Sequence, residues 1–205
     1  MSILLVDDHA IVRAGLRRLL GAVGDAPIRE AATGEDALEM ARAERPQLVV
    51  LDLNLPGISG LELLRRLLAE HGGLRVLVLS MHAEPLYAVR AMEAGARGFL
   101  SKNASADELL LAVRKVGDGG RHIQHDVAQE MALLSVGGSE PMRQLSEREL
   151  EILRLLGEGR SLGQIADALG VGYKTIANSC TQLKTKLGVA RTADLVRVAL
   201  GLRSG

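Results

Sequence analysis

The 205-residue sequence has few cysteines and aromatic residues, and it carries no formal net charge. Because Cys180 is the single cysteine, an internal disulfide is excluded and a reducing, cytoplasmic setting is expected. Tyr87, Phe99 and Tyr173 are the only aromatic side chains, so the cores have to be built from aliphatic residues. The N-terminus lacks the features of a signal peptide, and no apolar run approaches the ~20 residues that span a bilayer. The composition therefore indicates neither export nor a membrane.

The charged residues are unevenly distributed. Residues 1–120 contain 14 Lys and Arg against 16 Asp and Glu, whereas residues 144–205 contain 9 against 6. A small acidic excess followed by a basic one fits a cation or phosphate site in the first part and a nucleic-acid contact in the second. The length suits one domain of ordinary size followed by a smaller one.

Short apolar runs alternate with amphipathic stretches over residues 1–117, which is typical of repeated β-α units around a buried parallel sheet. The predicted strands are 3–6, 27–31, 48–53, 74–80 and 97–100, and the predicted helices are 10–21, 34–44, 59–71, 84–94 and 105–117. This pattern predicts an α/β domain with a five-stranded, doubly wound parallel sheet.

The pattern changes after residue 117. Residues 118–143 are rich in glycine and polar residues and are predicted to form a linker, with one short helix at 126–135. Over residues 144–205 only helices are predicted, at 146–157, 161–169, 173–187 and 192–201. The C-terminal segment is therefore expected to be a small all-α domain of four helices.

Five polar residues fall where the predicted strands end, at the edge where doubly wound sheets collect their ligands. They are Asp7, Asp8, Asp52, Ser80 and Lys102. Converging carboxylates repel one another unless a cation lies among them, and their oxygen ligands suit Mg²⁺. Asp52 could then attack a phosphoryl donor, while Lys102 and Ser80 stabilise phosphoryl oxygens. Taken singly, each residue could equally be a solvated loop residue.

Four segments resemble a response-regulator receiver domain: LLVDDH at 4–9, LDLNLPGISG at 51–60, LSMH at 79–82 and EAGARGFLSK at 93–102. The resemblance covers all of 1–117 and implies a flavodoxin-like fold with Asp52 as the phosphoacceptor. It implies Lys102 as the lysine that pairs with the phosphoryl group, Ser80 as the switch hydroxyl and Phe99 as the switch aromatic. The implied Mg²⁺ ligands are Asp7, Asp8, Asp52 and the backbone carbonyl of Asn54.

Three neighbouring residues are ambiguous. Asn103 stands where many receivers have proline, so the geometry of the peptide bond after the lysine could differ. His9 and His82 flank the site, but they are more simply explained as exposed loop residues because no cysteine or second histidine stands at ligand spacing.

Residues 145–200 resemble the output domain of LuxR-type transcription regulators, in LSERE at 145–149, GRS at 159–161 and KLG at 186–188. The resemblance identifies 161–169 and 173–187 as the scaffold and recognition helices of a helix-turn-helix. The recognition helix carries Lys174, Lys184 and Lys186 and no acid, which suits a groove bordered by phosphates. Helical spacing directs Ile176, Leu183 and Leu187 to the core. The residues expected to face DNA are Lys174, Thr175, Ala177, Asn178, Thr181 and Lys184.

The DNA-facing side of this helix departs from the family pattern. Ala177 and Ser179 stand where relatives commonly have Lys or Arg and His, which leaves fewer charged contacts. Asn178 has the chemistry to read adenine, whereas the threonines and lysines suit phosphates. Helix 192–201 presents an apolar stripe that could either pair two output domains or pack within its own.

Together the resemblances imply a two-component response regulator of the NarL/FixJ type. A histidine kinase is expected to phosphorylate Asp52, and the altered receiver then lets the output domain form a homodimer on DNA. A turnover phosphatase is disfavoured because Asn54, two residues after Asp52, cannot act as an acid or base. The alternative is a regulator that acts independently of phosphorylation or through protein contacts.

Overall fold

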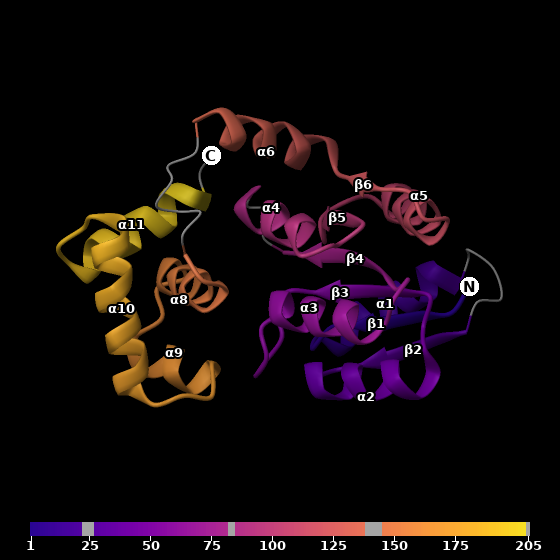
Figure 1. Ribbon diagram of the computed structural model, residues 1–205, viewed down its shortest axis with the longest axis horizontal. Coiled ribbons are helices and arrows are strands. Elements are labelled where there is room, and N and C mark those ends of the chain that lie inside the picture. Colours follow the sequence, from indigo (N-terminus) through magenta and orange to yellow (C-terminus); the bar gives the residue numbers. More distant parts are fainter. Residues whose placement is uncertain (22–26, 82–84, 138–144, 204–205) are drawn as a thin grey trace. The chain divides into compact units, whose positions relative to one another are not determined.

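The computed structural model describes residues 1–21, 27–81, 85–137 and 145–203. The chain divides into two compact units, Met1–Ala132 and Leu133–Gly205. The first unit is a β-sheet covered by helices, and the regular elements among the described residues of the second unit are all helices (Figure 1). In the described residues, no helix is both long and apolar enough to cross a membrane.

The sheet of the first unit is parallel, in the order β2-β1-β3-β4-β5-β6. Its strands are β1 (Ile3–Val6), β2 (Ile28–Ala31), β3 (Leu48–Asp52), β4 (Arg75–Ser80), β5 (Gly98–Ser101) and β6 (His122–Ile123). Its helices are α1 (Ala10–Leu20), α2 (Gly34–Glu44), α3 (Gly60–Glu70), α4 (Pro85–Glu93) and α5 (Ala106–Gly117). The doubly wound fold predicted from the sequence is confirmed, and the predicted elements agree with these bounds to within one or two residues.

Local chemistry fixes the helix starts and burial fixes the strands. Thr33, Ser59 and Ser105 each accept the N–H three residues ahead, at 3.1, 3.2 and 3.2 Å, and so cap α2, α3 and α5. Every residue of β1, β3 and β5 is buried, as expected for strands covered on both faces. Helices α1 and α5 pack against each other, whereas α2, α3 and α4 form a second series of neighbours.

The sixth strand was not predicted. Residues His122 and Ile123 pair in parallel with Gly98 and Phe99 of β5. Two residues are too few to show the alternating pattern by which strands are identified in a sequence. Gly98 makes the close approach feasible, because a Cβ there would lie 2.9 Å from the His122 carbonyl oxygen. The segment predicted as linker therefore begins by extending the sheet, and helix α6 (His125–Gly137) follows.

Over the described residues 145–203, the second unit has the expected four helices: α8 (Glu147–Gly157), α9 (Leu162–Ala168), α10 (Tyr173–Leu187) and α11 (Thr192–Arg203). Ser146 and Ser161 form complete capping boxes at the starts of α8 and α9. In α11, Leu195 and Ala199 are 0% and 3% exposed. A Cβ at Gly157 of α8 would lie 2.9 Å from the Ala199 Cβ, so part of the apolar stripe of α11 packs within its own unit.

Candidate functional site

The carboxyl edge of the sheet brings the predicted polar residues together. Asp7 follows β1, Asp52 ends β3 and Ser80 ends β4, and each of these residues is 2% exposed. Asp8 is more open, with 33% of its side chain exposed. One ligand atom from each of Asp7, Asp8, His9 and Asp52 lies within 4.8 Å of the others, so the group could hold a metal ion.

Lys102 reaches this group from the loop after β5. Its Nζ lies 2.6 Å from Asp7 Oδ2 and 2.5 Å from Asp52 Oδ2, and only 5% of its side chain is exposed. Its backbone N–H donates to the Ser80 carbonyl at 2.8 Å, which fixes the lysine beside the end of β4. The Lys102–Asn103 peptide bond is trans, since no cis bond occurs among the described residues.

Lys102 pairs with two buried carboxylates, Asp7 and Asp52, so its single charge neutralises only part of their negative charge. Burial raises the pKa of Asp52 and so does the charge of Asp7, although Lys102 opposes both. Burial alone would lower the pKa of Lys102, but the two carboxylates outweigh it and raise the pKa. Lys102 therefore stays charged, and a second cation would relieve the remaining repulsion.

Two backbone contacts orient the carboxylates. Asp7 Oδ1 accepts the His9 N–H at 2.8 Å, and Asp52 Oδ1 accepts the Asn54 N–H at 3.0 Å. Arg13, on the first turns of α1, donates from Nη1 to the Asp7 carbonyl at 2.6 Å. Arg13 was not predicted as a site residue, because its basic side chain resembles any other charge on an amphipathic helix.

The residues around this edge differ in how accessible they are. Phe99 is fully buried in β5, opposite Val78 of β4 and Ile123 of β6. The His9 side chain is 65% exposed, and its Nδ1 lies 2.6 Å from Asp8 Oδ1. His82 lies outside the described residues.

In the second unit, α10 has one buried face and one exposed face. Ile176, Cys180 and Leu183 are buried, at 0%, 3% and 0% exposure, and they anchor the helix. The residues predicted to face DNA lie on the other side: Lys174, Thr175, Asn178 and Thr181 are exposed, and Ala177 and Lys184 are half-buried. The Thr181 hydroxyl donates to the Ala177 carbonyl at 3.1 Å, and its oxygen can still accept a bond.

Lys186 differs from the other lysines of this helix. Its Nζ lies 2.7 Å from Oε2 of Glu149, which is 5% exposed and also accepts the Ser146 N–H at 2.7 Å. Burial alone would raise the pKa of Glu149, but these hydrogen bonds lower it. Lys186 thus fastens α10 to the start of α8.

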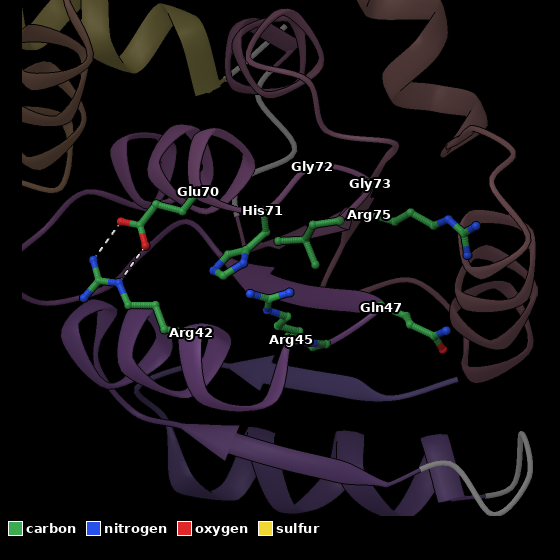
Figure 2. A pocket seen from close by; sticks show the side chains of 10 residues that line it. Arg42, Arg45, Gln47, Glu70, His71, Gly72, Gly73 and Arg75 are labelled. Carbon is green, nitrogen blue, oxygen red and sulfur yellow. Dashed lines mark hydrogen bonds and ion pairs between the residues drawn. The ribbon is translucent and has the colours of Figure 1, made fainter.

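A hollow of about 730 Å³ lies at the opposite edge of the sheet, before β3 and β4 (Figure 2). Arg42 pairs there with Glu70 through bonds of 2.6 and 2.7 Å. Arg75 extends away from His71 and donates to the Gly117 carbonyl. Arg42 in the last turn of α2 and Arg45 directly after the helix lie where positive charge offsets the helix dipole. This hollow contains none of the predicted site residues.

Comparison with known proteins gives matches over nearly the whole chain. Residues 3–114 match the response regulator receiver domain family, and residues 143–199 match the luxR family of bacterial regulatory proteins. The transcriptional activator protein ExaE of Pseudomonas putida is 42% identical, over 98% of this chain and 96% of ExaE. Response regulator UvrY of Shigella flexneri is 35% identical, over 98% of this chain and 94% of UvrY. A solved structure of RcsB from Salmonella enterica serovar Typhimurium, bound to a promoter in the presence of phosphomimetic BeF3−, is 25% identical with a TM-score of 0.72, over 100% of this chain and 98% of that one.

Proposed function

Because the chain belongs to the response regulators that join a receiver domain to a LuxR-type DNA-binding domain, we propose that Asp52 is the phosphoacceptor. Members of this family take the phosphoryl group from a histidine kinase and regulate transcription by binding DNA; they are not turnover enzymes. The observation that carries the assignment is the buried position of Asp52 at the carboxyl end of β3, with Lys102 Nζ 2.5 Å from its carboxylate.

The chemistry follows from these positions. A carboxylate oxygen of Asp52 attacks the phosphorus, the bond to the donor breaks as the new P–O bond forms, and an acyl phosphate results. Lys102 neutralises a phosphoryl oxygen, and the Ser80 hydroxyl donates to another. Phe99 serves as the switch aromatic, in the strand that leads to Lys102.

We assign the metal as Mg²⁺, held by Asp7, Asp8, Asp52 and the backbone carbonyl of Asn54. The residues fit a hard cation, because oxygen ligands converge there and Lys102 leaves part of their charge uncompensated. When bound, Mg²⁺ neutralises charge on the phosphoryl oxygens.

In the second unit, α10 is the proposed recognition helix. Its contacts with double-stranded DNA are assigned to Lys174, Thr175, Ala177, Asn178, Thr181 and Lys184, the side facing away from the anchoring residues. Asn178 is assigned to a base edge and the lysines to phosphates. Lys186 is excluded from this set because it pairs with Glu149.

The broader proposal divides the chain into a receiver at 1–117, a connecting segment at 118–143 and a DNA-binding domain at 144–205. Phosphorylation favours the receiver state in which two copies form a homodimer on DNA. The protein is placed in the cytoplasm, where kinase and DNA are both accessible.

Incubation with Mg²⁺ and acetyl phosphate tests the assignment directly. Intact-protein mass spectrometry should show the gain of one phosphoryl group, and peptide mapping should locate it at Asp52. Asp52→Asn should show no gain, whereas Asp118→Asn, an exposed residue after α5, should match the wild type. Phosphorylation of Asp52→Asn at the wild-type rate would exclude Asp52 as the acceptor.

A further inference from the structure

Gln124 joins two parts of the receiver unit through three hydrogen bonds. Its backbone N–H donates to the Phe99 carbonyl at 3.1 Å, and its side-chain Oε1 accepts the Ser101 N–H at 2.9 Å. Its own carbonyl accepts the Ala128 N–H at 2.9 Å, in the first turn of α6. One residue therefore connects the end of β5 to the start of α6.

The side-chain bond replaces a missing part of the sheet. The pairing of β5 with β6 ends at Phe99 and Ile123, so the Ser101 N–H has no strand residue to bond. Ser101 is 7% exposed, and a buried N–H without a partner costs free energy. Gln124 Oε1 supplies that partner.

Ser101 in turn shapes the loop that carries Lys102. Its Oγ accepts the Asn103 N–H at 3.1 Å, and its carbonyl accepts the Ala104 N–H at 3.0 Å. Ser101 also precedes Lys102 directly, so a shift of the Ser101 peptide moves the backbone from which Lys102 reaches Asp52. The Gln124 side chain thus acts on the lysine through one peptide unit.

We propose that Gln124 is a positioning residue for Lys102 and that it couples the state of the Asp52–Lys102 site to α6. This inference rests on the proposed role of Asp52. Coupling is reciprocal, so a change at Lys102 biases the start of α6, and a change at Gln124 alters phosphorylation of Asp52. Because α6 runs into the second unit, it is the segment that carries the bias toward the DNA-binding domain.

Three variants of the full-length chain separate this role from general stability. Gln124→Met keeps the length of the side chain but removes the acceptor, whereas Gln124→Glu keeps an acceptor oxygen. Gln129→Met makes the same replacement at an exposed position of α6 and serves as the matched control. If Gln124→Met loses amide protection in β1 and β3, Gln124→Asn, which is one methylene shorter, replaces it.

The first measurement is the rate of acyl phosphate formation with Mg²⁺ and acetyl phosphate, followed by intact mass. Gln124→Met should lower the rate about fivefold, the factor that corresponds to one lost hydrogen bond of ~1 kcal/mol. Gln124→Glu should restore most of the rate, and Gln129→Met should match the wild type. In a Lys102→Ala background, Gln124→Met should cause no further fall, because its effect passes through the lysine.

The second measurement is hydrogen exchange in the first turn of α6, with and without phosphorylation. Phosphorylation should change exchange there in the wild type but not in Gln124→Met. If Gln124→Met shows the wild-type rate of phosphorylation and the wild-type exchange response of α6, the inference is overturned and the proposed function is not. The same holds if Gln124→Met lowers the phosphorylation rate by an undiminished factor in the Lys102→Ala background. A wild-type chain that gains no phosphoryl group would overturn the proposed function, and this inference with it.

Discussion

Asp52→Asn is expected to stabilise the receiver unit in the absence of divalent cations, although it removes the proposed phosphoacceptor. Asp52 and Asp7 are each 2% exposed and share one ammonium group, at 2.5 and 2.6 Å. Burial raises the pKa of Asp52, with the charge of Asp7 adding to it against Lys102, so ionising Asp52 in the folded chain costs free energy. Asparagine removes that cost, keeps an acceptor for the Asn54 N–H and leaves Lys102 paired with Asp7.

The raised pKa of Asp52 gives the sign of the pH dependence. A carboxyl group whose folded pKa lies above its unfolded value of about 3.9 destabilises the fold as pH rises through that interval. The wild type and Asp52→Asn should therefore differ least in stability below about pH 4, and this difference should level off above the folded pKa of Asp52. At pH 7 the gain should be about 1–2 kcal/mol, in the range of single stabilising substitutions.

Scanning calorimetry of the full chain in EDTA measures this gain. One to two kcal/mol should raise the midpoint of the receiver transition by about 3–8 °C. Mg²⁺ at ten times its Kd should add about 1.4 kcal/mol to the wild type and less to Asp52→Asn, which also identifies the receiver transition. Asp118→Asn should stay within about 0.5 kcal/mol of the wild type. A lower midpoint for Asp52→Asn than for the wild type in EDTA would refute the reasoning.

Three further experiments test other contacts. Glu149→Gln should destabilise the second unit by about 1–3 kcal/mol in calorimetry at pH 7, compared with Asp167→Asn as an exposed control. This loss of stability should shrink as pH falls from about 4.3 through the lowered pKa of Glu149. An equal loss at pH 7 and pH 3 would contradict the expectation. Gly98→Ala should cost about 1–3 kcal/mol and speed amide exchange in β6, because its Cβ would lie 2.7 Å from Leu77 Cδ1; wild-type exchange would contradict the contact. On random-sequence duplex DNA, Lys174→Ala should reduce the slope of log affinity against log salt concentration by about 0.9, whereas Lys186→Gln should leave that slope unchanged. Equal slopes for both variants would show that pairing with Glu149 does not keep Lys186 from phosphates.

Much of the fold was predictable because it depends on local patterns. Strands β1, β3 and β4 each contain a continuous apolar run of at least four residues, and helices α2, α3 and α5 begin at capping residues that can be identified in the sequence. The acidic edge follows from topology, since parallel strands place their carboxyl ends together. Residues far apart in the sequence, such as Asp7, Asp52 and Lys102, could thus be assigned to one place without any structure.

The contacts that could not be predicted depend on register and side-chain reach. Gln124 meets Ser101 only because two residues of β6 pair with β5 in one register. Lys186 was grouped with the basic residues of the recognition helix, yet its partner Glu149 lies 37 residues away on another helix. Spacing along one helix shows which side chains share a face, but not which one bends toward a neighbouring element.

Strand β6 also has a consequence for how the receiver can be separated, fused or transplanted. Without β6, β5 would be an edge strand with unpaired backbone groups, which are prone to pairing with other chains. Residues 118–124 therefore cover an edge as well as connecting two units. An excised receiver that ends at residue 117 should aggregate, and a hybrid regulator joined after Gln124 should remain monodisperse. Insertions between α5 and β6 would have to preserve the register in which β6 pairs with β5. This requirement, and not the length of the connecting segment, would limit them.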